Sequence, residues 1–112
     1  AAMGDGEVMV SGVEISADVT VRLSVIKGVS IETPMLENDD ICGVIYSDEN
    51  IEQAVFYAVK IMNDIVQEKL ELSFNDAGML LSAVGDLKFC QVVDPKRTVM
   101  MCIPKTILSK LF

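Results

Sequence analysis

Apolar and polar residues alternate most regularly in residues 19–26. The apolar members are Val19, Val21, Leu23 and Val25, and the polar ones between them are Thr20, Arg22 and Ser24. Because successive side chains of a strand point to opposite faces, this period of two predicts a β-strand with one face in the core and the other in water.

Shorter extended pieces are predicted on both sides of this strand. Upstream, residues 8–10 and 13–15 are largely apolar and flank Ser11-Gly12, which indicates a short strand or a hairpin. Downstream, Gly28 ends this first group of extended pieces. Residues 29–33 are predicted to form another extended piece, which Pro34 stops. A polar loop is then expected over residues 37–40, followed by a β-prone run over residues 41–46.

The apolar spacing changes to a helical one after residue 50. Residues 47–50 offer several N-cap oxygens, and the apolar positions that follow predict a long helix; they are Ile51, Ala54, Val55, Ala58, Ile61, Met62 and Ile65. The opposite, water-facing side is predicted to carry Glu52, Gln53, Lys60, Asn63, Asp64, Gln67 and Glu68.

A second helix is predicted over residues 74–84. Ser73 and Asp76 approximate a capping box, and Gly85 is a plausible C-cap. Two β-rich runs follow, residues 87–93 and 98–103, and the turn-type residues 94–97 would join them as an antiparallel hairpin. Pro104 suits the first turn of a short terminal helix.

These elements predict one α+β domain over residues 1–112, with short antiparallel strands, two main helices and a C-terminal β-hairpin. Of the 112 residues, 51% are apolar, which is enough for a core and leaves apolar surface for a partner domain or subunit. We therefore expect a homo-oligomer or another assembly.

Charge and hydropathy exclude two classes of partner. Seventeen acidic residues against nine basic ones give a net charge of −8, and no basic cluster is present, so nucleic acid is not expected as a ligand. No apolar run approaches the ~20 residues that cross a bilayer. We expect no membrane partner and a cytoplasmic location.

Several residue types that can carry chemistry have a simpler structural interpretation. Cys42, Cys90 and Cys102 are odd in number and widely spaced among apolar residues, and the chain has no histidine, which favours reduced, buried thiols over a disulfide, a metal site or a nucleophile. Ser82 has no accompanying base and is expected to bond a helix carbonyl. The acidic loop, residues 37–40, lacks the order of a calcium loop and is expected to be solvated.

Asp5 and Glu7 are the candidate catalytic residues. The glycines of Gly4-Asp5-Gly6-Glu7 allow two carboxylates to approach a metal, a water molecule or a substrate closely. Asp-Gly is also a common hairpin turn, so spacing alone leaves open a pure turn at Asp5 and a surface residue at Glu7.

The sequence from Ala1 to Glu7, followed by Val8 and by residues 11–14, resembles the signature D-x-H-A-x-x-G-D-G-E-x-x-x-x-G-x-E of the acetamidase/formamidase family, entered just after its histidine. Residues 80–82, 85–87 and 91–94 are similar to the family's second helix and following strand, and Pro104-Lys105 to its C-terminal end. Residues 29–40 match only loosely, and Gly78 stands where bulkier residues are usual.

The resemblance implies the C-terminal part of a larger, mainly β amidohydrolase that converts formamide or acetamide to a carboxylate and ammonia. It implies an oligomer and a divalent metal such as zinc, with Glu7 as general base and proton shuttle and Asp5 orienting it or joining the metal shell. The signature's Asp and His would precede Ala1, so the site needs the N-terminal portion of the enzyme or a second subunit. The alternative is a non-catalytic, acidic α+β oligomerisation or interaction module.

Overall fold

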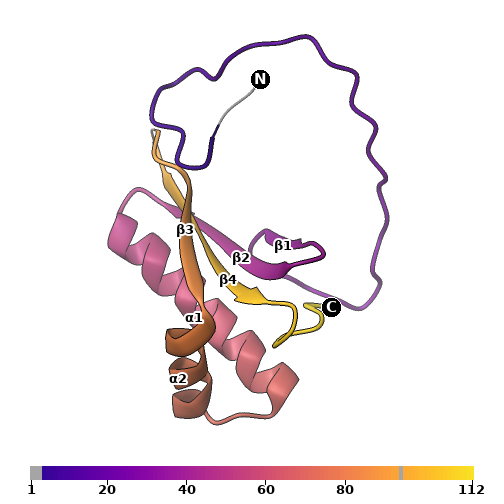
Figure 1. Ribbon diagram of the computed structural model, residues 1–112, viewed down its shortest axis with the longest axis vertical. Coiled ribbons are helices and arrows are strands. Elements are labelled where there is room, and N and C mark those ends of the chain that lie inside the picture. Colours follow the sequence, from indigo (N-terminus) through magenta and orange to yellow (C-terminus); the bar gives the residue numbers. More distant parts are fainter. Residues whose placement is uncertain (1–3, 94) are drawn as a thin grey trace.

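The computed structural model describes residues 4–93 and 95–112, and it confirms an α+β fold (Figure 1). Its strands are β1 (Met35–Glu37), β2 (Ile41–Asp48), β3 (Asp86–Gln91) and β4 (Arg97–Pro104), and its helices are α1 (Ile51–Leu70) and α2 (Phe74–Val84). The strands form one antiparallel sheet in the order β1-β2-β4-β3. Within this sheet β1 and β3 are therefore the edge strands.

Helix α1 covers one face of the sheet, where it packs across β2 and β4. Ala54, Ala58, Met62 and Val66 recur every four residues along α1 and are fully buried. They meet a sheet surface that includes Val44, Val99 and Ile103, also fully buried. This apolar layer is the core, and it confirms the helical stripe predicted from the sequence.

Both helix starts form as predicted. At α1 the Asn50 side chain accepts hydrogen bonds from the backbone N–H groups of Glu52 and Gln53, and at α2 Ser73 accepts one from Asp76. Each cap satisfies donors that the first helical turn leaves unpaired. Gly85 ends α2, and its N–H donates to the carbonyl of Leu81.

The prediction of a half-buried strand over residues 19–26 is wrong. These residues form no described strand, and the side chains of Val19, Val21, Leu23 and Val25 are 70–90% exposed. The predicted strand or hairpin over residues 8–15 is likewise not formed. Alternation indicates which side chains share a face, but a strand also needs a neighbouring strand and an apolar surface that covers one side. Apart from an isolated bridge at Val13, residues 8–31 have neither in the described fold.

Three smaller predictions are also corrected. Asn63, assigned to the wet side of α1, is only 4% exposed because it faces α2. The predicted terminal helix at Pro104 is a single turn, closed by bonds from the N–H groups of Ile107 and Leu108 to the Pro104 carbonyl. The C-terminal hairpin is confirmed as β3–β4; within its predicted turn, Asp94 lies outside the described residues.

Two glycines on α2 and at its end provide a matched stability test. A Cβ at Gly85 would collide with the Met101 side chain and the Leu81 backbone, whereas a Cβ at Gly78 would lie 3.8 Å from Oδ1 of Asn63, an ordinary contact. We expect Gly85→Ala to lower the free energy of unfolding by about 1–3 kcal/mol through overpacking. Gly78→Ala should raise it by up to ~1 kcal/mol through helix propensity. Urea denaturation of both variants measures the difference, and equal effects would contradict this packing at Gly85.

Candidate functional site

The segment that carries Asp5 and Glu7 is hydrogen bonded to the end of β3. Gly6 has a φ of +72°, which glycine adopts readily, and its N–H donates to the Cys90 carbonyl at 3.2 Å. The Val92 N–H donates to the Glu7 carbonyl at 2.9 Å, and Glu7 forms an isolated parallel bridge with Gln91. The backbone of this segment therefore follows the last residues of β3 even though it forms no regular strand.

The two carboxylates sit in different surroundings. Asp5 lies in a turn and is exposed, while Glu7 is half-buried next to β3. The turn considered for Asp5 is thus present. Glu7 lies where the chain begins to run beside β3, as the structural interpretation of this residue also expected. A turn between glycines still leaves both carboxylates accessible, so neither geometry decides between a structural and a catalytic role.

The residues around this segment do not complete a metal site. No group of three or more His, Cys, Asp or Glu side chains that could hold a metal ion occurs in residues 4–93 and 95–112. Zinc in proteins is usually held by three or four side chains, and Asp5 and Glu7 supply two at most. The described part of the chain therefore does not fit the metal by itself.

The three thiols are free, as the sequence predicted. Cys42 and Cys102 are buried, and the Cys42 thiol donates to the Leu108 carbonyl at 3.3 Å. Burial raises the pKa of Cys90, with a further contribution from the negative charge of Asp5. A raised pKa keeps this thiol protonated, which disfavours a nucleophilic role beside the candidate carboxylates.

Ser82 also has the structural role expected of it. Its hydroxyl donates to the Gly78 carbonyl, one helical turn earlier in α2, at 2.8 Å. This bond is the usual one for a serine within a helix. Because the hydroxyl proton is engaged in this bond, the structure favours the structural role over a nucleophilic one.

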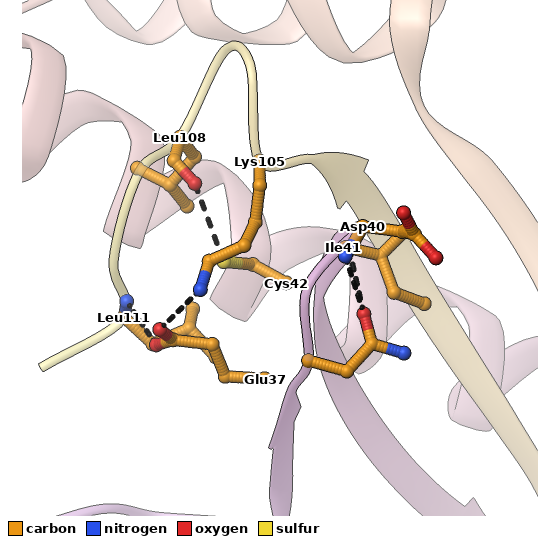
Figure 2. A network of polar contacts seen from close by, with 8 residues as sticks. Glu37, Asp40, Ile41, Cys42, Lys105, Leu108 and Leu111 are labelled. Atoms are coloured by element: carbon orange, nitrogen blue, oxygen red, sulfur yellow. Dashed lines mark hydrogen bonds and ion pairs between the residues drawn. The ribbon is translucent and has the colours of Figure 1, made fainter.

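Residues 37–40 are all exposed, as predicted for the acidic loop, but two of them also make structural contacts. Asn38 caps the turn before β2 by accepting from the N–H groups of Asp40 and Ile41. Glu37 ends β1 and holds the C-terminal segment, as Figure 2 shows: its carboxylate accepts from the Leu111 N–H at 3.0 Å and pairs with Lys105 Nζ at 2.9 Å. Sequence spacing gave no sign of these two contacts across more than 60 residues.

A wide apolar groove, about 1040 Å³, was not predicted from the sequence. It lies between α1 and α2 and reaches the sheet, with Phe56, Phe74 and Leu87 among its walls. Asn63 also lines it, and neither polar atom of its side-chain amide has a hydrogen-bond partner among the described residues. Gly78 lies opposite Asn63. Its small size, already noted in the sequence, was the one feature that could have indicated a groove here.

Comparison with solved structures identifies proteins of similar fold. An acetamidase from Bacillus halodurans is 35% identical with a TM-score of 0.65, over 70% of this chain and 26% of that one. A predicted acetamidase/formamidase from the thermophile Thermoanaerobacter tengcongensis is 31% identical with a TM-score of 0.71, over 75% and 28%. An acetamidase from Yersinia enterocolitica is 29% identical with a TM-score of 0.70, over 76% and 26%.

The resemblance to the acetamidase/formamidase family is thereby confirmed in both fold and sequence. The chain spans about a quarter of the length of these structures, which agrees with its being one part of a larger fold. A scan of protein-family models and a search of curated proteins gave no match. No helix in the described part of the chain is long and apolar enough to cross a membrane.

The Glu37 contacts predict a pH dependence of stability. The Leu111 N–H, and after it Lys105, hold the pKa of the Glu37 carboxyl below its ordinary value of 4.5. A lowered folded-state pKa adds stability above pH 4.5 that is lost as the pH falls through the folded-state value. We expect Glu37→Gln to have a lower free energy of unfolding than the wild type at neutral pH. The difference between the two free energies should decrease below pH 4.5. Denaturant titrations across this range test it, with the exposed Glu68→Gln as the control.

Proposed function

We propose that this chain contributes the acidic edge of an amidohydrolase site that acts on small linear amides such as formamide and acetamide. The observation that carries the proposal is the likeness to three acetamidase or acetamidase/formamidase structures, together with the Gly4-Asp5-Gly6-Glu7 segment fixed to the end of β3. Hydrolase-type chemistry is supported at the level of the fold. The substrates and the roles of individual residues are the proposed part.

In the proposed reaction Glu7 is the general base. Its carboxylate takes a proton from a water molecule, the water oxygen attacks the amide carbon, and the same proton passes to the leaving nitrogen as the C–N bond breaks. The carboxylic acid and ammonia formed in this step exchange one more proton, so the final products are a carboxylate and an ammonium ion, and atoms and charge balance with one water consumed. Asp5, two residues away, would orient Glu7 or the attacking water.

The chain needs a second polypeptide segment for this reaction. It contains no histidine, and its described residues hold no cluster able to bind a metal. Amide hydrolysis also requires a positive or hydrogen-bond-donating group facing the developing oxyanion, and none is assigned within the Asp5–Glu7 segment. We therefore propose that the remaining groups, including the ligands of any divalent metal such as zinc, come from the N-terminal portion of the same enzyme or from another subunit.

A non-catalytic interaction module is the second candidate, and one observation favours it. Twelve large apolar side chains are exposed in residues 8–31, which is surface suited to a protein partner. The two candidates differ in one measurable respect, namely ammonia release by the assembled protein.

The test is ammonia release from formamide and acetamide, measured on the native assembly and on the isolated chain, with and without added Zn²⁺. We expect activity from the assembly and none from the isolated chain. In the assembly, Glu7→Gln should lower kcat by about 10²- to 10⁴-fold, the usual contribution of a general base. Glu68→Gln, an exposed change of the same chemistry on α1, should leave kcat unchanged.

Two results would contradict the proposal at different levels. An inactive native assembly, with either amide and with Zn²⁺ present, would remove the amidohydrolase function. An active assembly in which Glu7→Gln retains the wild-type rate would remove only the role of Glu7. Intact mass and N-terminal sequencing of the native protein would show whether it carries sequence before Ala1.

A further inference from the structure

Strand β3 is interrupted by a bulge close to its end. Phe89 lies opposite Val99 on β4, but the next paired residue of β3 is Gln91, which lies opposite Thr98. Cys90 is therefore an extra residue in the strand. Because side chains of a strand alternate between its two faces, one extra residue reverses the face on which the following side chain lies. Bulges often occur next to active sites, where they re-aim a side chain in this way.

The bulge places Gln91 on the face of the sheet that α1 does not cover. Val99 is fully buried in the core on the α1 side, so its neighbour Thr98 lies on the other face. Residues directly opposite each other on paired strands share a face, and Gln91 therefore lies on the face of Thr98. In a regular strand Gln91 would instead share the face of Phe89, on the α1 side.

Glu7 meets Gln91 on this uncovered face. The Asp5–Glu7 segment lies beside the end of β3 (Figure 1), where Glu7 forms its parallel bridge with Gln91. Opposite residues of a parallel pair point to the same side, and neighbouring strands lie about 4.8 Å apart. The Glu7 carboxylate and the Gln91 carboxamide, on side chains of equal length, can therefore both contact a molecule as small as formamide or acetamide.

The described fold engages neither of these two polar groups. Glu7 and Gln91 are both partly buried. Among residues 4–93 and 95–112, no side-chain hydrogen bond involves the carboxylate of one or the carboxamide of the other. The Thr98 hydroxyl, opposite Gln91, pairs with the Ser47 hydroxyl at 2.8 Å. A partly buried carboxamide gains most from a partner that matches both its N–H and its C=O.

Lys88, the basic residue of β3, lies on the same face but is a poorer candidate for recognising an amide. It lies opposite Met100, and its ammonium group contacts the Asp86 carboxylate at 3.3 Å. A lysine also offers donors only, so it can bind the carbonyl of an amide but cannot accept a hydrogen bond from the amide N–H. Gln91 offers both kinds of group.

We propose that Gln91 makes the site of the proposed hydrolysis selective for primary amides. Its carboxamide matches a primary amide edge to edge: its N–H donates to the substrate carbonyl, and its carbonyl accepts from the substrate N–H that lies cis to that carbonyl. Glu7 and the attacking water then meet the amide carbon from one side of the amide plane. This role rests on the proposed function and adds to it the residue that holds the substrate.

Secondary amides cannot form this pair of hydrogen bonds. Their N-substituent lies cis to the carbonyl oxygen, as the next Cα does in a trans peptide bond, so their N–H points away from that edge. N-methylacetamide can therefore accept one hydrogen bond from Gln91 but cannot return the second. A lone donor in the place of Gln91 would bind both compounds through the carbonyl alone and would not distinguish them.

The test compares acetamide with N-methylacetamide on the native assembly. It measures the KM of acetamide in ammonia release and the Ki of N-methylacetamide as a competitive inhibitor. Gln91→Met keeps the length of the side chain and removes both polar groups, so the KM should rise at least about tenfold for two lost hydrogen bonds, and the Ki by about threefold or less for one. Gln53→Met, at an exposed glutamine on α1, is the matched control and should change neither constant.

A second variant keeps the inference testable if Gln91→Met disturbs the fold. Gln91→Glu keeps the shape and the acceptor of the side chain and loses only the donor, so the KM and the Ki should rise by similar factors. An unchanged KM in both variants, or an equal rise of KM and Ki in Gln91→Met, would overturn the role of Gln91 while leaving the hydrolysis in place. An inactive wild-type assembly would instead overturn the proposed function, and this role with it.

Discussion

The packing of α1 on β2 and β4 is the interaction on which the rest of the structure depends. Ala54 and Ala58 are small enough for the helix to approach the sheet closely, and Met62 and Val66 fill the space further along the same stripe. The contact fixes β2 and β4 as the central pair, leaves β1 and β3 at the edges, and sets where α2 can lie. The groove and the attachment of the Asp5–Glu7 segment both follow from the position of β3.

Local signals predicted the elements around this core well. The apolar stripe of α1, the Asn50 and Ser73 caps and the β3–β4 hairpin all depend on residues close together in the sequence, and all form as expected. The contacts that escaped prediction join distant residues. Glu37 reaches Leu111 and Lys105, and Asn63 faces α2, and no pattern of spacing encodes either pairing.

Residues 8–31 show a different limit of sequence reasoning. The alternation in residues 19–26 is that of a strand with one apolar face, but no part of the described fold covers that face, so the side chains are exposed. The candidate site shows the same limit, because the sequence identified single residues but not the groups around them. Asp5 and Glu7 were identifiable from the glycine-rich segment, and the bridge between Glu7 and Gln91 is visible in the fold, yet the described residues do not complete a hydrolytic site around them.

The order of the strands has a consequence for the route by which the chain reaches this fold. β2 and β4 pair along their full length from Ile41–Pro104 to Asp48–Arg97, although both helices and β3 lie between them in the sequence. Closing so long a loop costs entropy before any pairing energy is gained, which slows the folding of such topologies. The helix hairpin and the β3–β4 hairpin are local and can form early. We therefore expect β2 to join a partly built surface, and the central pair of the finished sheet to be among the last contacts made.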